Sequence, residues 1–235
     1  MEAVNADDER SQAVTQEIET LQEQLASLAG IVESVFAESI IALVDGDLTA
    51  AREVRQEDYK AHKVWLQADR LCVDLLASGA LSLDEVNLVC ASIKIAFDLK
   101  MMADEAMHIS QLISMCSAQK LSRGAATDLV PRMAELTQGI LGDTSEALVN
   151  RSLIEAGNLH TACRELESLN RQLFEHLANE IASAKQNAQV ALALTLVGRA
   201  FTDMGQCALD IVTHIPSIRG EEGPQDVPPD EEAPC

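Results

Sequence analysis

A line of ionisable side chains runs through an otherwise apolar stretch, residues 93–109, which reads IKIAFDLKMMADEAMHI. Lys100, Asp104 and His108 recur every four residues, so on a helix they would share one face. An ammonium, a carboxylate and an imidazole in one row could form a polar site or a recognition surface for a partner. They could also be the solvent-facing side of an ordinary helix, so the surrounding elements have to decide between these interpretations.

The chain lacks the short motifs that mark common catalytic sites. It contains no G-x-S-x-G, no H-E-x-x-H, no glycine-rich phosphate loop and no dinucleotide-binding fingerprint. Cys163 precedes an arginine and a glutamate, but nothing near it marks an activated thiolate. The other histidines, at 62, 160, 176 and 214, are scattered along the chain. No nucleophile–base pair is recognisable, and we therefore expect no enzymatic activity.

The charge balance excludes several classes of partner. The chain has 38 acidic and 17 basic residues, for a net charge of −21. Nucleic acids and anionic membranes both require clustered Lys and Arg, and this sequence has no such cluster. Basic protein surfaces and cations are the natural partners. The N-terminus, MEAVNADDERSQ, lacks a secretion-signal pattern, and no uninterrupted apolar run could span a membrane. We expect a cytoplasmic protein without membrane insertion.

The six cysteines predict neither a metal ribbon nor a redox motif. They lie at positions 72, 90, 116, 163, 207 and 235, so no two form a C-x-x-C pair. Most fall among apolar positions of expected helices, where cysteine usually acts as a small buried hydrophobe. We therefore expect free thiols in a reduced protein.

The hydrophobic pattern predicts an all-α protein. Apolar residues are 47% of the chain but aromatic residues only 3%, a composition that suits helix bundles. Apolar residues recur at spacings of three and four in six segments, at about 14–43, from 47, from 82, 128–156, from 159 and from 190. Ser82 and Glu85 form a capping-box pattern at the start of the third segment. Five of the six prolines lie in an acidic tail, 216–235, which we expect to be disordered.

The six expected helices form two repeats of three. The apolar positions of the third and sixth helices superpose with a shift of 102 residues: Ile95 with Val197, Leu99 with Phe201, Met102 with Met204, Ala106 with Ala208 and Ile109 with Ile211. Such self-similarity indicates an internal duplication. We expect two tandem three-helix bundles, residues 1–117 and 118–215, followed by the tail at 216–235.

This layout resembles the PhoU family of phosphate-signalling proteins. The third helix of each PhoU repeat carries a pattern close to K-I-x-x-D-L-E-R-I-G-D-H-A-x-N-I, and residues 94–109 here read KIAFDLKMMADEAMHI. The segment VRQEDYKAH at 54–62 is similar to the second helix of the family, V-I-E-x-D-x-E-I-D. In the second repeat, LVGRAFTDMGQCALDI at 196–211 keeps little more than Gly205, Ala208 and Ile211. The resemblance covers about residues 15–215.

The resemblance implies a metal site from which this sequence departs. Family members bind metal through acidic pairs, spaced four apart, on the second and third helices of each repeat. Here the first-repeat positions hold Asp58 with His62 and Lys100 with Asp104. The second-repeat positions hold no carboxylate: they are Asn170, Phe174, Thr202 and Gln206.

Two interpretations of the first-repeat positions follow. We expect Lys100 to replace the charge of the metal and to pair with Asp58 or Asp104, so that no cofactor is required. The alternative is Fe or Zn in the first repeat only, with Asp58, His62 and Asp104 as the ligands.

The resemblance also implies a function. It indicates a cytoplasmic regulator of phosphate transport that docks on a phosphate ABC transporter and a sensor histidine kinase, as a homo-oligomer, expected to be a dimer. Two alternatives from other classes are a metal-binding helical protein and a structural helical oligomer, including a regulator of another transporter.

Overall fold

The computed structural model of the chain describes residues 2–45, 48–116, 125–153, 158–184 and 187–219. Within these ranges the chain forms six helices and no strand, which confirms the all-α fold class. The helices are α1 (Glu2–Asp45), α2 (Leu48–Ala77), α3 (Leu83–Cys116), α4 (Ala125–Asn150), α5 (Leu159–Ala182) and α6 (Ala188–Ile218). The polar tail from residue 220 onward lies outside the described residues.

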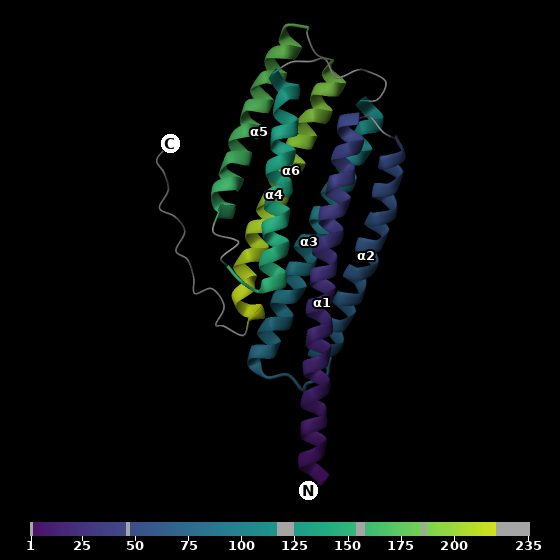
Figure 1. Ribbon diagram of the computed structural model, residues 1–235, viewed down its shortest axis with the longest axis vertical. Helices are drawn as coiled ribbons and strands as arrows, with labels where there is room; N and C mark the ends of the chain where they lie inside the picture. Colours follow the sequence, from purple (N-terminus) through teal and green to yellow (C-terminus); the bar gives the residue numbers. More distant parts are fainter. Residues whose placement is uncertain (1, 46–47, 117–124, 154–157, 185–186, 220–235) are drawn as a thin grey trace.

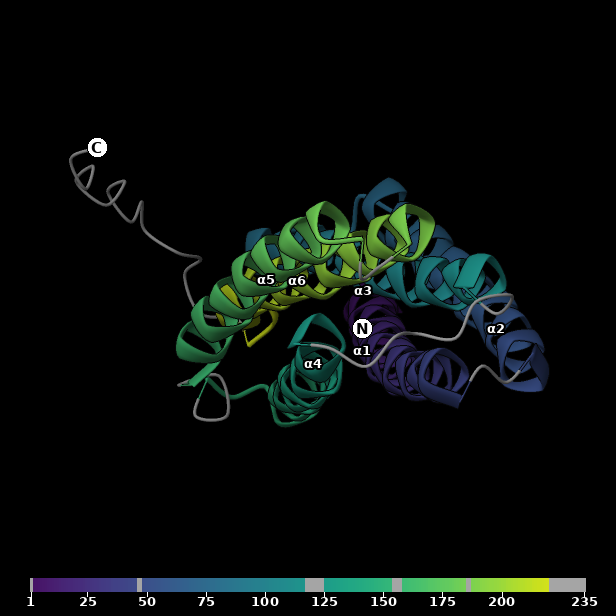
Figure 2. The same cartoon turned by 90° about the horizontal axis from the view of Figure 1, so that it is seen from above.

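The helices pack as two three-helix units that lie side by side. Helices α1, α2 and α3 contact one another, as do α4, α5 and α6. The two units meet where α3 packs along α6 and where α1 packs along α4 (Figures 1 and 2). Seen from above, α5, α6 and α3 line one side of the molecule, α4 and α1 line the other, and α2 closes one edge (Figure 2). The division of the chain into domains at residues 1–117 and 118–215 stays a prediction.

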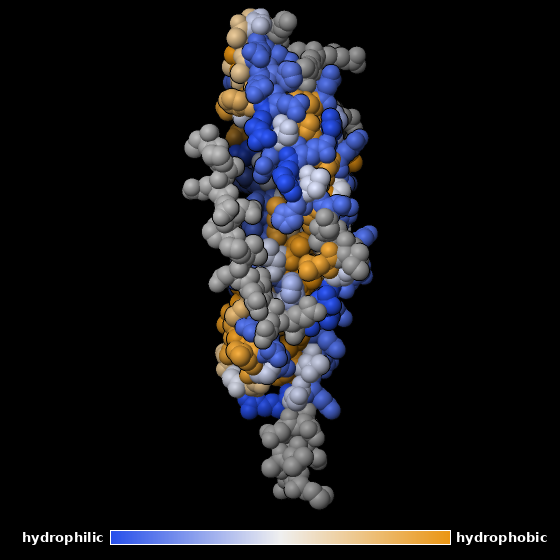
Figure 3. Space-filling model, turned by 90° about the vertical axis from the view of Figure 1, so that its left-hand side faces the viewer, coloured by the Kyte–Doolittle hydropathy of each residue, from blue (hydrophilic) through white to orange (hydrophobic). Residues whose placement is uncertain are grey.

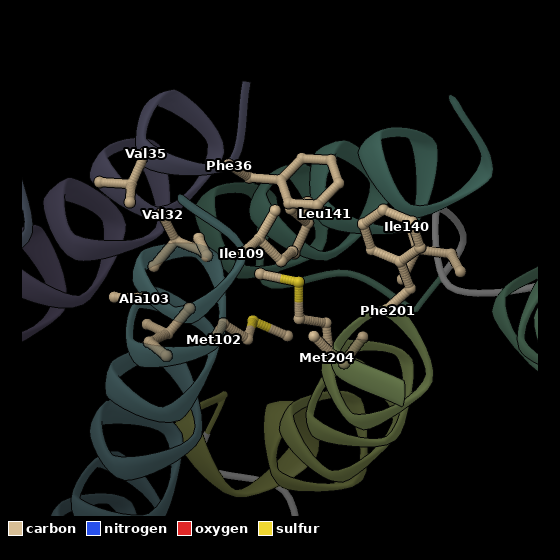
Figure 4. Close-up of a cluster of buried hydrophobic side chains, with 14 of the residues drawn as sticks. Val32, Val35, Phe36, Met102, Ala103, Ile109, Ile140, Leu141, Phe201 and Met204 are labelled. Atoms are coloured by element: carbon tan, nitrogen blue, oxygen red, sulfur yellow. The ribbon is translucent and has the colours of Figure 1, made fainter. Parts of the chain in front are cut away.

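The core is built from the predicted apolar stripes and extends across both units. Buried residues of all six helices form one large cluster, and a smaller cluster joins α1, α2 and α3 near Leu21 and Leu75. At the junction of the units, the rings of Phe36 and Phe201 meet edge to face with centroids 5.8 Å apart (Figure 4). Edge-to-face pairs add about 0.5–1.5 kcal/mol to the stability gained by burial. The two units therefore share one core.

The helix ends follow local sequence signals. Ser82 and Glu85 form the predicted capping box: the Glu85 carboxylate accepts from the Ser82 N–H at 2.7 Å, and the Ser82 hydroxyl accepts from the Glu85 N–H at 3.3 Å. After α2, Gly79 adopts a φ of +61°, a conformation that glycine adopts without strain. At the start of α6, the Asn187 side chain accepts from the Gln189 N–H at 2.7 Å.

Two predicted boundaries were wrong by a few residues. We expected the tail to begin at residue 216, but α6 continues to Ile218 with Pro216 inside its last turn. A proline there forfeits one backbone hydrogen bond, whereas the buried Ile218 side chain gains by staying helical. We also expected the fourth helix to reach residue 156, but α4 ends at Asn150, where Arg151 takes a positive φ of 50°.

Helix α1 contains a long and largely apolar segment. Over Arg10–Leu43 it is long and apolar enough to cross a membrane, by length and composition alone. Its apolar side chains are nevertheless the core of the bundle: Leu21, Leu28 and Val35 are completely buried. Because α1 contacts α2, α3 and α4, an apolar surface on several sides is what its position requires.

Candidate functional site

The line of ionisable residues on α3 faces α2 and forms an ion-pair triad there. The Lys100 ammonium lies 3.4 Å from Oδ1 of Asp58 on α2 and also forms an ion pair with Asp104 on its own helix. Only 13% of the Lys100 side chain is exposed to solvent. The predicted pairing of Lys100 is thus confirmed for both carboxylates, and it ties α2 to α3.

The triad leaves no obvious place for a metal ion in the first repeat. An ammonium already occupies the space between the two carboxylates, and a cation beside it would meet like charge. His62 is exposed, and its ring packs against Trp65 with centroids 5.5 Å apart. Among the described residues, no three His, Cys, Asp or Glu side chains lie close enough to hold a metal ion. The ligand set Asp58, His62 and Asp104 stays a prediction, and this geometry does not fit it.

The corresponding positions of the second repeat also serve other purposes. Thr202 donates its hydroxyl proton to the Arg199 carbonyl at 2.8 Å, and the Gln206 amide donates to Asp210 at 3.0 Å. Phe174 is 61% exposed and offers no ligand atom. Asn170 approaches the backbone of α6 at Gly198, where a Cβ atom would clash with its side-chain oxygen. The second repeat uses these positions for helix packing and local hydrogen bonds.

His108 does not join the triad, although it lies four residues after Asp104. It is exposed and faces Glu105, with 3.6 Å between His108 Nδ1 and Glu105 Oε2. This confirms the interpretation of His108 as a solvated helix-face residue. The line of three predicted from spacing therefore divides into a partly buried ion pair, Lys100 with Asp104, which faces α2, and an exposed histidine nearer to α6.

A second polar cluster lies between α3 and α6, and the sequence analysis did not anticipate it. Burial raises the pKa of Asp98 to about 6, and the negative charge of Asp210 on α6 adds to the rise. Nearby on α6, burial lowers the pKa of His214, and Lys94 of α3 lowers it further. The two helices run antiparallel, so that residues near the start of α3 face residues near the end of α6. If the two duplicated helices had been assumed to pack antiparallel, the sequence would have predicted that Asp98 and Asp210 lie close together.

Farther along the same two helices, the structure has a cavity of about 390 Å³. Its lining is partly apolar and partly charged: Glu105, His108, Gln111 and Leu112 of α3, with Leu196, Arg199, Ala200 and Asp203 of α6. The charged groups pair along their own helices, Glu105 with His108 and Arg199 with Asp203, the latter at 3.2 Å. The lining contains no Ser, Thr or Cys side chain that could act as a nucleophile.

Three of the described thiols, those of Cys72, Cys163 and Cys207, have raised pKa values that disfavour the nucleophilic thiolate. Burial raises the pKa of Cys72 to about 12, with a further rise from Asp69, and burial raises the pKa of Cys163 to about 11. Burial also raises the pKa of Cys207 to about 12, helped by the charge of Asp98. Cys90 is exposed, and all four of these cysteines are free. Free thiols are as expected for the described part of the chain; the Cys116 side chain and Cys235 lie outside it.

The fold is a helical bundle of two three-helix units packed side by side. The family model for the PhoU domain matches residues 25–113, in agreement with the resemblance predicted from the sequence. The match ends near the C-terminal end of α3 and thus covers most of the first three-helix unit.

Curated relatives extend the similarity over both repeats. The phosphate-specific transport system accessory protein PhoU homolog of Pseudomonas putida is 24% identical over 194 residues, covering 80% of this chain and 75% of the relative. The PhoU accessory protein of Edwardsiella tarda is 25% identical over 186 residues, covering 77% and 75%.

Solved structures show the same fold. The crystal structure of PhoU from Pseudomonas aeruginosa superposes with a TM-score of 0.81 at 19% identity, covering 88% of this chain and 99% of that one. The phosphate transport system regulatory protein PhoU from Streptococcus pneumoniae gives a TM-score of 0.77 at 14% identity, covering 88% and 96%.

Proposed function

We propose that this protein is an accessory regulator of a phosphate-specific transport system. The observation that carries the proposal is the similarity to curated PhoU accessory proteins over about four fifths of the chain, spanning both repeats. The partners we propose are a phosphate ABC transporter and a sensor histidine kinase, met in the cytoplasm by a homodimer of this chain.

The mechanism that we propose is docking of helical faces, without chemistry on a substrate. Three features of the described residues support it: buried thiols with raised pKa values, charged side chains paired along their own helices, and a cavity without a nucleophile. The net charge of −21 favours partners with basic surfaces, because long-range attraction speeds their encounter.

We further propose that the first repeat works without a metal. Lys100 holds the positive charge between the second and third helices that a bound Fe or Zn ion would otherwise supply, and it does so with two carboxylates. Metal analysis of the purified protein tests this, with Asp104→Ala as the comparison. Stoichiometric Fe or Zn that is lost in the Asp104→Ala protein would contradict the proposal.

The regulatory role is tested in the source organism. Deletion of the gene should change the phosphate dependence of a phosphate-regulated reporter, and expression of the full chain should restore it. The ATP-binding subunit of the phosphate transporter should co-purify with the tagged protein. An unchanged reporter together with no co-purifying transporter subunit would refute the proposal. Light scattering of the purified protein separately reports whether it is a dimer.

A further inference from the structure

Exposed apolar side chains are more numerous on α2, α3, α5 and α6 than on α1 and α4. Among the described residues, α2 has four exposed large hydrophobic side chains, α3 has three, and α5 and α6 have two each. Helices α1 and α4 have one each. On α3 and α6 they include Phe97 (56% exposed), Leu192 (57%) and Leu196 (42%). Figure 3 shows the left-hand side of the molecule in Figure 1, where orange patches are separated by blue surface.

Apolar and charged residues of α3 and α6 lie in two stripes, one along each helix. On α3, Phe97, Met101, Glu105, His108 and Leu112 follow one another at spacings of three and four, so they share a face of the helix. On α6 the corresponding stripe consists of Leu192, Leu196, Arg199 and Asp203. The 390 Å³ cavity opens between the stripes and is lined by members of both. We call this surface the α3–α6 groove.

The lining of the groove suits an α-helix of a partner. Helix-in-groove recognition places apolar side chains, spaced three and four apart, into a hydrophobic cleft between two helices. Here Leu112, Leu196 and Ala200 provide apolar walls for such an anchor. The remaining lining is polar and lies where the flanks of a bound helix would be.

The charge of the groove favours a basic helix. Glu105 and Asp203 line the cavity, and the pair Asp98 and Asp210 lies farther along the same interface. The basic groups nearby are Arg199, which pairs with Asp203 at 3.2 Å, and Lys94. The Arg199–Asp203 pair is exposed on both sides, and such pairs contribute at most about 1 kcal/mol, so a partner's Lys or Arg can displace it.

We propose that the α3–α6 groove is the docking site for a basic amphipathic helix of a partner protein. This inference rests on the proposed function, because it names the surface through which the regulator binds. The apolar side of the partner helix enters the cavity beside Leu112 and Leu196, and its Lys or Arg residues contact Glu105 and Asp203.

Binding of a model helix to the full chain tests the groove directly. The probe is a fluorescent Leu/Lys amphipathic peptide of about five turns, compared with a scrambled peptide of the same composition. Glu105→Gln combined with Asp203→Asn should weaken binding about tenfold. The matched control, Glu135→Gln with Glu146→Gln, removes the same charge from exposed positions of α4 and should leave the affinity within about twofold.

A second pair of variants tests the apolar contribution. Leu196→Asp should abolish binding of the Leu/Lys peptide, whereas Val149→Asp on α4, which starts from a similarly exposed apolar residue, should not. Circular dichroism melts of all variants establish that each is folded. Equal losses in the groove and control variants, or equal binding of the scrambled peptide, would overturn the proposal. The proposal would also be overturned if Leu196→Asp converted a dimer to a monomer in sedimentation, because the groove would then hold a second copy of this chain.

The same variants distinguish failure of the groove from failure of the proposed function. In the phosphate-regulated reporter, the groove variants should behave as the deletion does, and the α4 variants as the wild type. A reporter that responds to deletion but not to the groove variants would refute the groove alone. A reporter that ignores deletion, combined with selective peptide binding, would refute the phosphate role and leave the groove standing.

Discussion

Replacing Lys100 by methionine removes the ammonium from the triad and keeps a side chain of similar length. At 3.4 Å from Asp58, the ion pair has a Coulomb energy of about 5 kcal/mol at an effective dielectric constant of about 20. Desolvation of the ammonium and the 42% exposure of Asp104 offset most of this energy. The substitution also leaves two carboxylates facing each other. We expect a loss of about 1–2 kcal/mol in the free energy of unfolding, or about 2–8 °C in Tm.

Urea unfolding at neutral pH measures this loss, and a divalent cation tests its cause. Zn²⁺ or Mn²⁺ should raise the unfolding midpoint of Lys100→Met, because the carboxylates then lack a counter-charge, and should leave the wild type unchanged. Lys60→Met is the matched control, since Lys60 pairs with Glu57 at 2.5 Å in an exposed setting and should cost under about 0.5 kcal/mol. Lys100→Met that is as stable as the wild type, and indifferent to the cations, would refute the role of Lys100 as a built-in cation.

Three further substitutions probe the α6 interfaces. Asp98→Asn should leave the free energy of unfolding unchanged below about pH 4 and raise it on the order of 1 kcal/mol above about pH 7. The reason is that Asp98 keeps its proton in the folded state up to a pKa of about 6, so the wild type loses stability as the pH rises from about 4 to about 6. Thermal melts across pH check this, and a difference between variant and wild type that does not change with pH would contradict it. Gly139→Ala should raise the free energy of unfolding by roughly 1 kcal/mol, because a Cβ there meets open space, whereas Gly198→Ala should not, because its Cβ would lie 2.8 Å from Leu173 Cδ2. Urea midpoints rank the two variants. Equal gains in stability would show that α5 can shift to accommodate the added methyl group. Phe201→Ala, at a completely buried position, should cost about 3–5 kcal/mol in urea unfolding, and a loss under about 1 kcal/mol would mean that the junction of the repeats collapses around the gap.

Hydrophobic periodicity was sufficient to predict the helices and their core faces. Ile95, Leu99 and Met102 are buried as their spacing predicted, and the capping box at Ser82 forms as written in the sequence. The errors lie at helix ends. At a helix end, the free energy gained or lost by one more turn is small. Burial of a single side chain, such as that of Ile218, therefore outweighs the helix-terminating tendency of Pro216.

The candidate site was predictable only where its residues lie close together in the chain or where a family pattern aligns them. Lys100 and Asp104 are one turn apart, and the family pattern pointed from them to Asp58. The cluster of Asp98 with Asp210 depends on the antiparallel packing of α3 on α6, a tertiary contact that no local spacing reveals. The same limitation hid the cavity, whose walls come from both repeats.

The antiparallel packing of two duplicated helices places an approximate two-fold axis between α3 and α6. If the repeats were identical, a helix lying in the groove would fit equally well in either direction. They are not identical: Phe97 corresponds to Arg199, and Lys94 corresponds to Leu196. Phe97 and Lys94 therefore lie on α3 at one end of the interface, and Leu196 and Arg199 lie on α6 at the other end, in different surroundings. Because the two repeats have diverged, the two ends of the groove differ. The proposed partner helix should therefore bind in one favoured orientation, with one helix for each copy of this chain.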